Sequence, residues 1–537
     1  MRFAAASVTT GCVVALVGVS ALLRTRGIEA GYWTDEGLAL GIASLPPWEI
    51  PAALAQDGSP PLYFMVLSGW VALVGTGEAA THALSLLIAL AAVPVAWWIG
   101  RSLFGPRAEL MAALVAAVHP YLTFYAQETR MYALVVLLSM LAAAGFAGAF
   151  ALGRRRWLTG FVLATAALLY THNWGLFLVG ASFGALALVW ARRPAARRAL
   201  ARDAMVAYGA LTLLYIPWVP TLLSQIEQTG APWSTRPDLG ELAVAMAIAL
   251  GAVVLGAVTS RSGRGRWPWQ EEAVGEGREA ETTAAPGRGP ALAGAGAPPA
   301  DGTAPGSRRL ALAVLVVLPM ATLLVAWLAS QFSPAWASRY VAVAVGPALL
   351  PAAVLLAPAR WWGAGVVIGV GAVAMVPVTH GVLAKGNARA VAEGMRSVGM
   401  GAGDLVVAAL PEHVAVLRGY LGPGMRYATT IGPERDPLIF DWRNAPGRLR
   451  AADPRAGTAR AVASLAPGDE LALVQPVERY EDRRAPWARL VRERSAHWQR
   501  RLDAHPRLRR VAVVPRQRGE TRALVYRLAK GPMRRGR

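Results

Sequence analysis

The chain has almost no cysteine. Its 537 residues include a single one, Cys12, which lies inside the first apolar run. One thiol provides neither a disulfide framework within the chain nor a cluster of thiolate metal ligands. The sequence therefore excludes a small cysteine-stapled domain and a cysteine zinc site. The cysteine content does not indicate a cellular compartment.

Charged residues are scarce as well. They account for 16% of the chain, hydrophobic residues account for 55%, and several apolar runs approach 20 residues. This composition is typical of a protein that crosses the membrane many times. The run at 3–23 has no small-residue cleavage site, so we interpret it as a retained span rather than a cleaved signal. The apolar runs predict about eleven transmembrane helices, at 3–23, 79–100, 108–124, 132–152, 157–170, 174–191, 205–223, 240–259, 310–329, 341–357 and 361–383.

A formal net charge of +21 raises the question of a nucleic-acid partner. The arginines, however, cluster in short segments between the apolar runs, where basic residues determine membrane topology, so we expect no nucleic acid. The short apolar segment 61–75 begins beside Pro60-Pro61, and we interpret it as interfacial or re-entrant. The basic clusters then all fall on the cytoplasmic side: Arg101/Arg107, Arg154–Arg156, Arg192/Arg193/Arg197/Arg198/Arg202, Arg261–Arg266 and Arg308/Arg309.

The sequence divides into two domains. Residues 1–383 are predicted to form the transmembrane domain, with 24–78 as an extracytoplasmic loop. Residues 261–309 lack aliphatic periodicity and are rich in Ala, Gly, Pro, Arg and Glu, which predicts a disordered cytoplasmic loop. Residues 384–537 predict a small extracytoplasmic α/β domain without a phosphate-binding glycine fingerprint. Its expected strands are 404–410, 468–474, 510–515 and 521–527, and its expected helices are 412–421 and 485–503.

Three polar stretches fall together on the extracytoplasmic side of this topology. The first is Tyr32–Gly37, which contains the adjacent acids Asp35 and Glu36. The others are Gln56–Tyr63 and Tyr125–Tyr132. Acids beside membrane-embedded helices are costly unless they have a function, so three such stretches indicate catalysis.

These stretches resemble the GT-C superfamily of integral-membrane glycosyltransferases, and in particular its bacterial branch related to protein O-mannosyltransferases and aminoarabinose transferases. The resemblance covers roughly residues 30–230 and is weaker around Ser338-Arg339-Tyr340. It implies an inverting enzyme of the plasma or inner membrane that works on the extracytoplasmic face. Such an enzyme takes a sugar, for example mannose or a pentose, from a polyprenyl-phosphate donor. The acceptor is left open among glycan, glycolipid and protein.

The resemblance implies roles for the residues in these motifs. Asp35 is the expected general base, because a carboxylate within hydrogen-bond reach can take the proton of an attacking hydroxyl. Glu36 is expected to orient Asp35 or the acceptor. Arg130 and Arg339 are candidates to hold the departing phosphate, because a guanidinium meets two phosphate oxygens at once. The expected substrate-binding residues are Asp57, Tyr63, Gln127, Glu128, Arg130, Tyr132, His172, Arg339 and Tyr340.

Several of these residues have a structural alternative. Arg339 could anchor a span at the interface, and Glu128 could position the acceptor, ligate a cation or pair with Arg130. Asp57 could cap the helix that begins at Pro60-Pro61. Relatives often carry His or Lys immediately before the two prolines, where this chain has Ser59. That departure weakens the case for a phosphate contact or metal ligand in this loop.

The sequence leaves open whether the protein binds a metal ion, and it leaves open two functions other than glycosyl transfer. His172 could bind a divalent metal together with an acid, but a metal site needs several ligands, and a hydrogen-bonded structural histidine is the alternative. No cofactor is certain. A transporter or lipid-linked sugar flippase also gathers charges within helices; such proteins often contain inverted repeats, and none is evident here. An assembly scaffold would leave Asp35 and Glu36 without a role.

Overall fold

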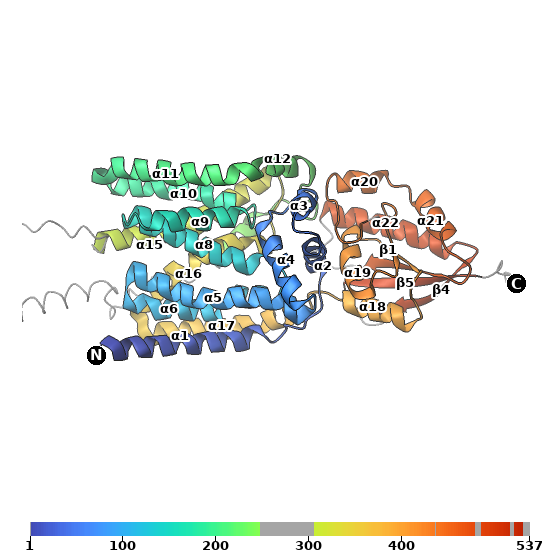
Figure 1. The fold of residues 1–537 in the computed structure, drawn as a ribbon, viewed down its shortest axis with the longest axis horizontal. Coiled ribbons are helices and arrows are strands. Elements are labelled where there is room, and N and C mark those ends of the chain that lie inside the picture. Colours follow the sequence, from blue (N-terminus) through green and yellow to red (C-terminus); the bar gives the residue numbers. More distant parts are fainter. Residues whose placement is uncertain (1, 248–304, 435, 478–484, 516–519, 530–537) are drawn as a thin grey trace, which may run out of the picture.

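Long apolar helices lie side by side in the N-terminal part of the chain (Figure 1). The computed structural model describes residues 2–247, 305–434, 436–477, 485–515 and 520–529. The helices of the bundle and of its connections are α1 (Arg2–Arg24), α2 (Thr34–Ala43), α3 (Ile50–Asp57), α4 (Leu62–Val74), α5 (Glu78–Phe104), α6 (Pro106–Val118), α7 (Pro120–Tyr125), α8 (Tyr132–Phe146) with its continuation η1 (Ala147–Ala151), α9 (Trp157–Leu169), α10 (Gly175–Arg192), η2 (Pro194–Ala196), α11 (Arg197–Tyr215), η3 (Ile216–Trp218), α12 (Val219–Gln228), α15 (Pro305–Phe332), η4 (Ser338–Val341), α16 (Ala342–Leu356), η5 (Ala357–Ala359) and α17 (Arg360–Leu383).

The bundle has the dimensions and the surface of a membrane domain. Within the described residues, seven helical stretches are long and apolar enough to cross a bilayer, and three shorter apolar helices accompany them at Val8–Arg24, Leu62–Val74 and Trp157–Leu169. Large apolar side chains remain exposed on the outside of the bundle, as lipid contact requires; examples are Leu22, Trp98, Leu163, Phe183, Leu213 and Val373. The prediction of a polytopic helical membrane protein is therefore confirmed.

The predicted span at 108–124 is not one continuous helix. It breaks between α6 and α7 at His119-Pro120, because a proline has no N–H for the carbonyl of Ala116 four residues earlier. The guanidinium of Arg24, at the end of α1, donates to this Ala116 carbonyl at 2.6 Å. Of the predicted loop 261–309, the structure describes only 305–309, which already belong to α15, and the predicted span 240–259 is described only to residue 247.

Helices α2, α3 and α4 lie at the end of the bundle that faces the C-terminal unit (Figure 1). The hydroxyl of Tyr32, just before α2, donates to the carbonyl of Thr76, just after α4, at 2.8 Å. The backbone N–H of Leu62, at the start of α4, donates to the carbonyl of Tyr170 at 2.8 Å. Helix α4 therefore begins and ends at the same end of the bundle, as expected for a segment that does not cross it.

The C-terminal unit is a five-stranded sheet with helices on both faces. Strand order is β2-β1-β3-β5-β4, with β1 parallel to β2 and β3, and with β5 antiparallel to β3 and β4. Apolar side chains alternate between the two faces of β1, so Val406 packs toward α18 and α19 while Val407 packs toward α22. The elements are α18 (Ala388–Ser397), β1 (Leu405–Ala408), η6 (Pro411–His413), α19 (Val414–Leu421), β2 (Arg426–Thr429), α20 (Ala445–Ala451), α21 (Pro454–Ala463), β3 (Glu470–Pro476), α22 (Pro486–Asp503), β4 (Leu508–Val514) and β5 (Thr521–Leu528).

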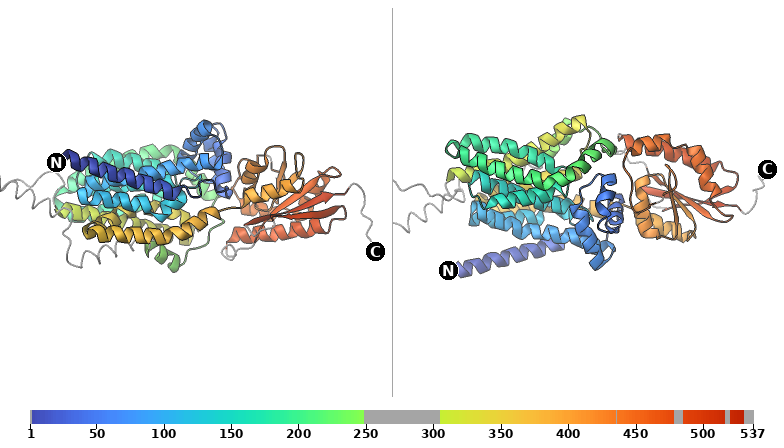
Figure 2. Two further views of the ribbon diagram at one scale, coloured as in Figure 1. Left: turned by 90° about the horizontal axis from the view of Figure 1, so that it is seen from below. Right: turned by 45° about the horizontal axis from the view of Figure 1, so that its top comes forward.

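The sheet unit packs directly on the end of the bundle, and Figure 2 shows the two parts in line. Two glycines of α2 make this possible: a Cβ at Gly37 would collide with Val416 of α19, and one at Gly41 would collide with the carbonyl of Leu438. Backbone hydrogen bonds also join the parts. The N–H of Trp442 donates to the carbonyl of Gln56 at 3.0 Å. The cavity described next lies at this junction.

Candidate active site

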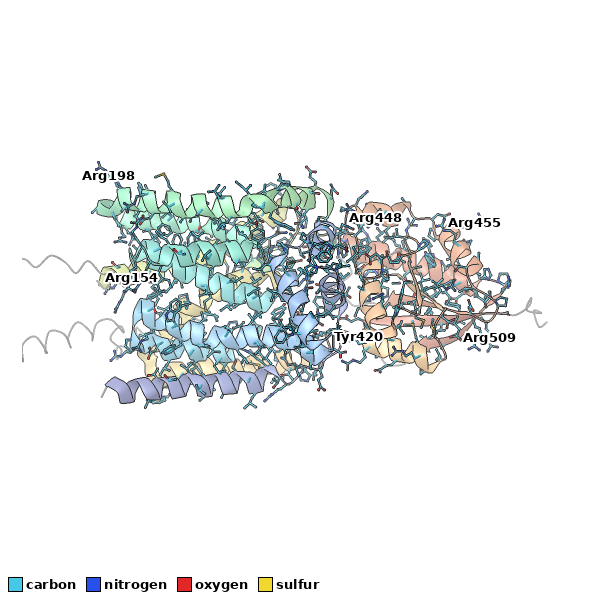
Figure 3. The ribbon with its side chains drawn as sticks, viewed as in Figure 1. Arg154, Arg198, Tyr420, Arg448, Arg455 and Arg509 are labelled. Atoms are coloured by element: carbon cyan, nitrogen blue, oxygen red, sulfur yellow. The ribbon has the colours of Figure 1, made fainter. Side chains whose placement is uncertain are left out.

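A cavity of about 350 Å³ lies between the end of the bundle and the C-terminal unit. This volume falls in the range of small-molecule sites, about 300–1,000 Å³. Its walls come from the start of α2, from the loops that follow α3, α7 and α9, and from η4 and η6. Figure 3 labels Tyr420 and Arg448 at the same junction. Segments far apart in the sequence therefore meet around one space.

The three polar stretches of the sequence converge on this cavity. Of the predicted site residues, those that line it are Asp35, Asp57, Arg130, His172, Arg339 and Tyr340. Asp35 lies in the first turn of α2, and its side chain is 22% exposed. Its Oδ2 is 3.9 Å from Nη2 of Arg130 and 3.8 Å from Nε of Arg339. These distances give electrostatic attraction but exceed hydrogen-bond length, so the carboxylate is not locked into a two-pronged pair.

The two arginines keep hydrogen-bonding capacity. Arg130 donates from Nη1 to the backbone carbonyl of Asp35 at 3.1 Å. The buried Nε of Arg130 and the buried Nε of Arg339 have no hydrogen-bond partner among the described residues. Arg339 also lies over the rings of Trp33 and Tyr340, at 5.7 and 5.2 Å from the ring centroids. Aromatic packing on one side therefore leaves both guanidinium groups able to bind an anion.

Asp57 and His172 complete the wall beside the arginines. Burial raises the pKa of the Asp57 carboxyl, while Arg130 and a hydrogen bond from Ser59 oppose that rise. Asp57 is the last residue of α3 and does not cap α4, whose preceding residue Pro61 makes no side-chain capping bond. Burial lowers the pKa of His172 to about 3, and the arginines add to this effect, so the ring is neutral. Its Nδ1 accepts from the backbone N–H of Trp174 at 3.1 Å.

Glu36 does not line the cavity, and the expectation that it orients Asp35 or the acceptor stays a prediction. Its carboxylate is fully buried and turns away from the cavity wall. Oε1 of Glu36 accepts from the Lys385 ammonium at 2.8 Å and lies 2.7 Å from Nε2 of His82. It also accepts from the Thr129 backbone N–H at 2.8 Å. Burial alone would raise the pKa of Glu36, but Lys385 and His82 lower it, so the group holds its charge.

Three other predicted residues also pack behind the wall rather than on it. Tyr63 and Tyr132 are fully buried and do not line the cavity. Gln127 joins the first loop to α7: its Oε1 accepts from the Gly27 N–H at 2.6 Å and its Nε2 donates to the Thr123 carbonyl at 2.9 Å. The expectation that these three residues bind the substrate directly therefore stays a prediction.

Glu128 does not pair with Arg130. Its side chain is buried, and its Oε2 has no hydrogen-bond partner among the described residues. Burial raises the pKa of Glu128 to about 8, and the nearby Glu36 charge adds to this effect. Glu128 is therefore largely protonated at neutral pH and does not supply a charge to the cavity.

The side chains around Asp35 do not form a metal site of the usual kind. In the ranges that the structure describes, no three His, Cys, Asp or Glu side chains come together where they could hold a metal ion. The charged neighbours of Asp35 are Arg130 and Arg339. The geometry therefore gives no support to the idea that His172 and an acid bind a metal.

Four residues that line the cavity or pair with Glu36 behind it were not predicted from the sequence: Lys385, Glu412, His413 and Trp442. The lysine had one visible signal: of the 54 basic residues of the chain only two are lysines, Lys385 and Lys530, and Lys385 directly follows the last span. Glu412 and His413 directly follow the apolar strand β1, and the carboxyl ends of parallel strands are common ligand sites. Trp442 carries no comparable signal in the sequence.

No known protein family and no curated protein matches this chain in sequence. Two crystal structures of ArnT from Cupriavidus metallidurans are similar to it over 98% of this chain and 100% of ArnT. The apo structure has a TM-score of 0.51 at 16% identity, and the structure bound to undecaprenyl phosphate has a TM-score of 0.55 at 13% identity. The arabinofuranosyltransferase AftD from mycobacteria has a TM-score of 0.47 at 14% identity, over 97% of this chain and 42% of AftD. The chain therefore has the fold of ArnT, the GT-C fold.

Proposed function

We propose that this protein is a membrane glycosyltransferase that moves a sugar from a polyprenyl-phosphate donor to an acceptor hydroxyl. The observation that carries the proposal is the pairing of Asp35 with Arg130 and Arg339 in one cavity at the end of the bundle. A carboxylate can accept the proton of the attacking hydroxyl, and guanidinium groups can stabilise the departing phosphate. The similarity to ArnT, whose structure has been determined with undecaprenyl phosphate, supports the class of donor.

In the proposed reaction, the acceptor hydroxyl attacks the anomeric carbon of the donor sugar. The proton of the hydroxyl passes to Asp35, the new glycosidic C–O bond forms, and the bond from the anomeric carbon to the phosphate oxygen breaks. The bonding electrons leave with the phosphate. A single displacement of this kind inverts the anomeric centre. The sugar itself, a hexose such as mannose or a pentose, is left open.

The negative charge that develops on the phosphate needs cations that are already in position. Arg130 and Arg339 suit this role, because each has an unpaired buried Nε–H and lies close to the carboxylate of Asp35. In the free enzyme, the Asp35 carboxylate and the two guanidinium groups attract each other electrostatically. When a phosphate enters, the guanidinium groups gain a partner and Asp35 becomes free to accept a proton.

We further infer that the cavity faces the extracytoplasmic side. Arg154 and Arg198 lie at the end of the bundle farthest from the C-terminal unit, whereas the cavity lies at the opposite end (Figure 3). Because basic loops stay in the cytoplasm, this separation favours an extracytoplasmic site. A polyprenyl chain can then remain in the bilayer while its phosphate reaches the cavity.

The experiment is a comparison of envelope glycans, glycolipids and glycoproteins in a deletion strain complemented with single variants. The wild-type chain and Glu29→Gln should restore the missing sugar, and Asp35→Asn should not. Glu29 is a matched control, because it is an exposed acid of the loop that precedes α2 and does not line the cavity. Restoration by Asp35→Asn at wild-type levels, or no difference between deletion and wild type, would contradict the proposal.

A further inference from the structure

The C-terminal unit supplies part of the cavity wall. Glu412 and His413 lie in η6, immediately after strand β1, and each is only 8% exposed. Trp442, from the loop before α20, lines the same region. These residues face the cavity from the side opposite the bundle, which provides Arg130 and Arg339. The proposed reaction gives them no role.

Both polar side chains of η6 have hydrogen-bonding atoms without a partner. Oε1 of Glu412 accepts from Nε1 of Trp487 at 2.8 Å, but its Oε2 has no partner among the described residues. Nε2 of His413 lies 2.6 Å from the hydroxyl of Thr34, but its Nδ1 has none. Buried polar atoms are nearly always paired in native proteins. Other buried polar atoms of the described residues are also unpaired, but these two belong to adjacent side chains that line the cavity, where a ligand can supply a partner.

The sheet topology independently favours a ligand site here. After β1 the chain forms β2 on one side of it and then crosses to form β3 on the other side, and all three strands are parallel. In open α/β sheets, ligands bind outside the carboxyl ends of the strands at the point where the strand order reverses. Glu412 and His413 stand at the carboxyl end of β1.

The surrounding side chains indicate the chemistry of the ligand. Trp33, Trp233 and Trp442 line the cavity, and the rings of Trp233 and Trp442 are 4.7 Å apart. The buried Nε1 atoms of Trp33 and Trp233 have no partner among the described residues. A sugar ring has an apolar C–H face that packs on an aromatic ring and hydroxyl groups that both donate and accept hydrogen bonds. Unpaired acceptors, unpaired indole donors and aromatic rings in one wall suit such a ligand.

The position of this wall indicates which of the two substrates it binds, the donor sugar or the acceptor. Thr34, whose hydroxyl contacts His413, directly precedes Asp35, so a sugar held by η6 lies next to the proposed base. The donor enters from the bundle, because its lipid chain stays in the membrane and its phosphate meets Arg130 and Arg339. The side of the cavity formed by the C-terminal unit is thus left for the acceptor.

We propose that Glu412, His413 and Trp442 form the acceptor subsite, and that the acceptor is a glycan rather than a protein. The terminal sugar of the glycan packs against Trp442, and its hydroxyl groups bind Oε2 of Glu412 and Nδ1 of His413. This inference rests on the proposed function and specifies the acceptor that the proposed function leaves open.

The test uses the purified full-length chain and three fractions from the deletion strain. The lipid extract supplies the donor, and the delipidated envelope glycans and the delipidated envelope proteins are offered as acceptors, with the transferred sugar detected by mass spectrometry. Each fraction is titrated while the other substrate is held in excess. The wild-type chain should modify the glycan fraction. Glu412→Gln should raise the glycan concentration required for half-maximal rate by about 10-fold, because an amide nitrogen in place of Oε2 cannot accept a hydrogen bond from a sugar hydroxyl.

The same variant should leave the requirement for the lipid extract unchanged, which separates acceptor binding from a general loss of structure. Trp442→Phe keeps an aromatic ring but has a smaller packing face, so it should also raise the glycan concentration required for half-maximal rate. This variant tests the acceptor subsite if Glu412→Gln does not fold. Glu493→Gln, an exposed acid of α22, is the matched control and should behave as wild type. Transfer to the protein fraction, an unchanged glycan requirement in the variants, or a shift in the lipid requirement alone overturns the acceptor subsite. Transfer only to a glycolipid of the lipid extract also overturns the acceptor subsite, whereas no transfer by the wild-type chain to any component of the three fractions contradicts the proposed function itself.

Discussion

The ammonium of Lys385 lies 2.8 Å from the carboxylate of Glu36, although the two residues are 349 positions apart. Lys385 also donates to the backbone carbonyl of Gln127 at 2.7 Å. The pair joins the end of α17 to the start of α2 and to the loop after α7, two of the segments that hold Asp35 and Arg130. The position of the cavity charges thus depends on a buried ion pair behind them.

Removing the lysine should therefore destabilise the protein. Lys385→Met leaves the Glu36 carboxylate buried beside His82 without its cation, and a broken buried pair typically costs about 3–5 kcal/mol. Thermal unfolding of the purified protein in detergent should show a marked fall in Tm. The double variant Glu36→Gln/Lys385→Met should recover part of the loss.

The half-exposed pair of Arg389 and Glu78 provides the control. Arg389 Nη2 lies 2.6 Å from Glu78 Oε1, but the two side chains are 40% and 23% exposed. Solvent screens such pairs, so Arg389→Met should cost about 0–1 kcal/mol. Equal Tm shifts for Lys385→Met and Arg389→Met would contradict the role given to the buried pair.

Arg130 is expected to hold the donor phosphate. Lysine keeps the charge but loses the two-pronged geometry, so Arg130→Lys should lower kcat/KM for the lipid donor and Arg130→Ala should lower it further. The loss should appear at the transition state, where the phosphate charge develops. Steady-state kinetics with the donor varied measures this effect.

A double-mutant cycle with Glu128 checks whether Arg130 has a structural role instead. The two side chains do not pair, so Glu128→Gln should not rescue Arg130→Ala. Recovery of transfer in the double variant would mean that Arg130 only balances Glu128, and the phosphate role would then be wrong.

Glu412 should make stability depend on pH. Burial raises the pKa of this carboxyl to about 7 from an ordinary value of 4.5, and the charge of nearby Asp35 adds to the rise. The folded state then binds more protons than the unfolded state between these two values, so the free energy of unfolding falls as pH rises from about 4.5 to 7. Glu412→Gln removes this contribution.

Thermal unfolding in detergent at pH 5 and pH 8 measures the effect as a difference between the two proteins. The Tm of Glu412→Gln minus the Tm of wild type should be larger at pH 8 than at pH 5. Buried His413, whose pKa burial lowers from 6.5 to about 4, makes stability depend on pH between these two values, but both proteins contain it and its contribution cancels in the difference. A wild-type-minus-variant difference that does not change with pH would contradict the burial of a titrating Glu412.

The proposed orientation in the membrane can be tested with single cysteines in a Cys12→Ala background. Thr76→Cys and Arg455→Cys, at exposed positions near the cavity end and in the C-terminal unit, should react with a membrane-impermeant thiol reagent in intact cells. Ser307→Cys, at the start of α15, should be protected. Labelling of Ser307→Cys with protection of the other two would reverse the orientation.

The fold could be predicted because a bilayer imposes long apolar helices on any chain that crosses it. The break at His119-Pro120 was missed, because a proline alone does not show whether a span breaks: Pro94 and Pro319 lie inside the continuous helices α5 and α15. The positions of Asp35 and Arg130 beside one cavity could also be predicted from the sequence, because the expected topology places their motifs at the same end of the bundle.

The role of Glu36 did not follow from the sequence. Its partners His82 and Lys385 lie on α5 and after α17, and no local pattern relates them to α2. Glu412 and His413 were missed for a similar reason. Their contribution depends on how the C-terminal unit packs against α2, through Gly37 and Gly41, and this packing has no periodicity that a single sequence can reveal.

The central claim is that Asp35 is the general base of a sugar transfer. The most direct measurement is the rate of transfer by purified Asp35→Asn enzyme, with the lipid extract of the deletion strain as donor source and its envelope glycans as acceptor. An amide of the same shape cannot take the proton, so the rate should fall by about 100-fold or more while Tm and binding of undecaprenyl phosphate stay close to wild type. Turnover by Asp35→Asn within a few-fold of the wild-type rate would contradict the account.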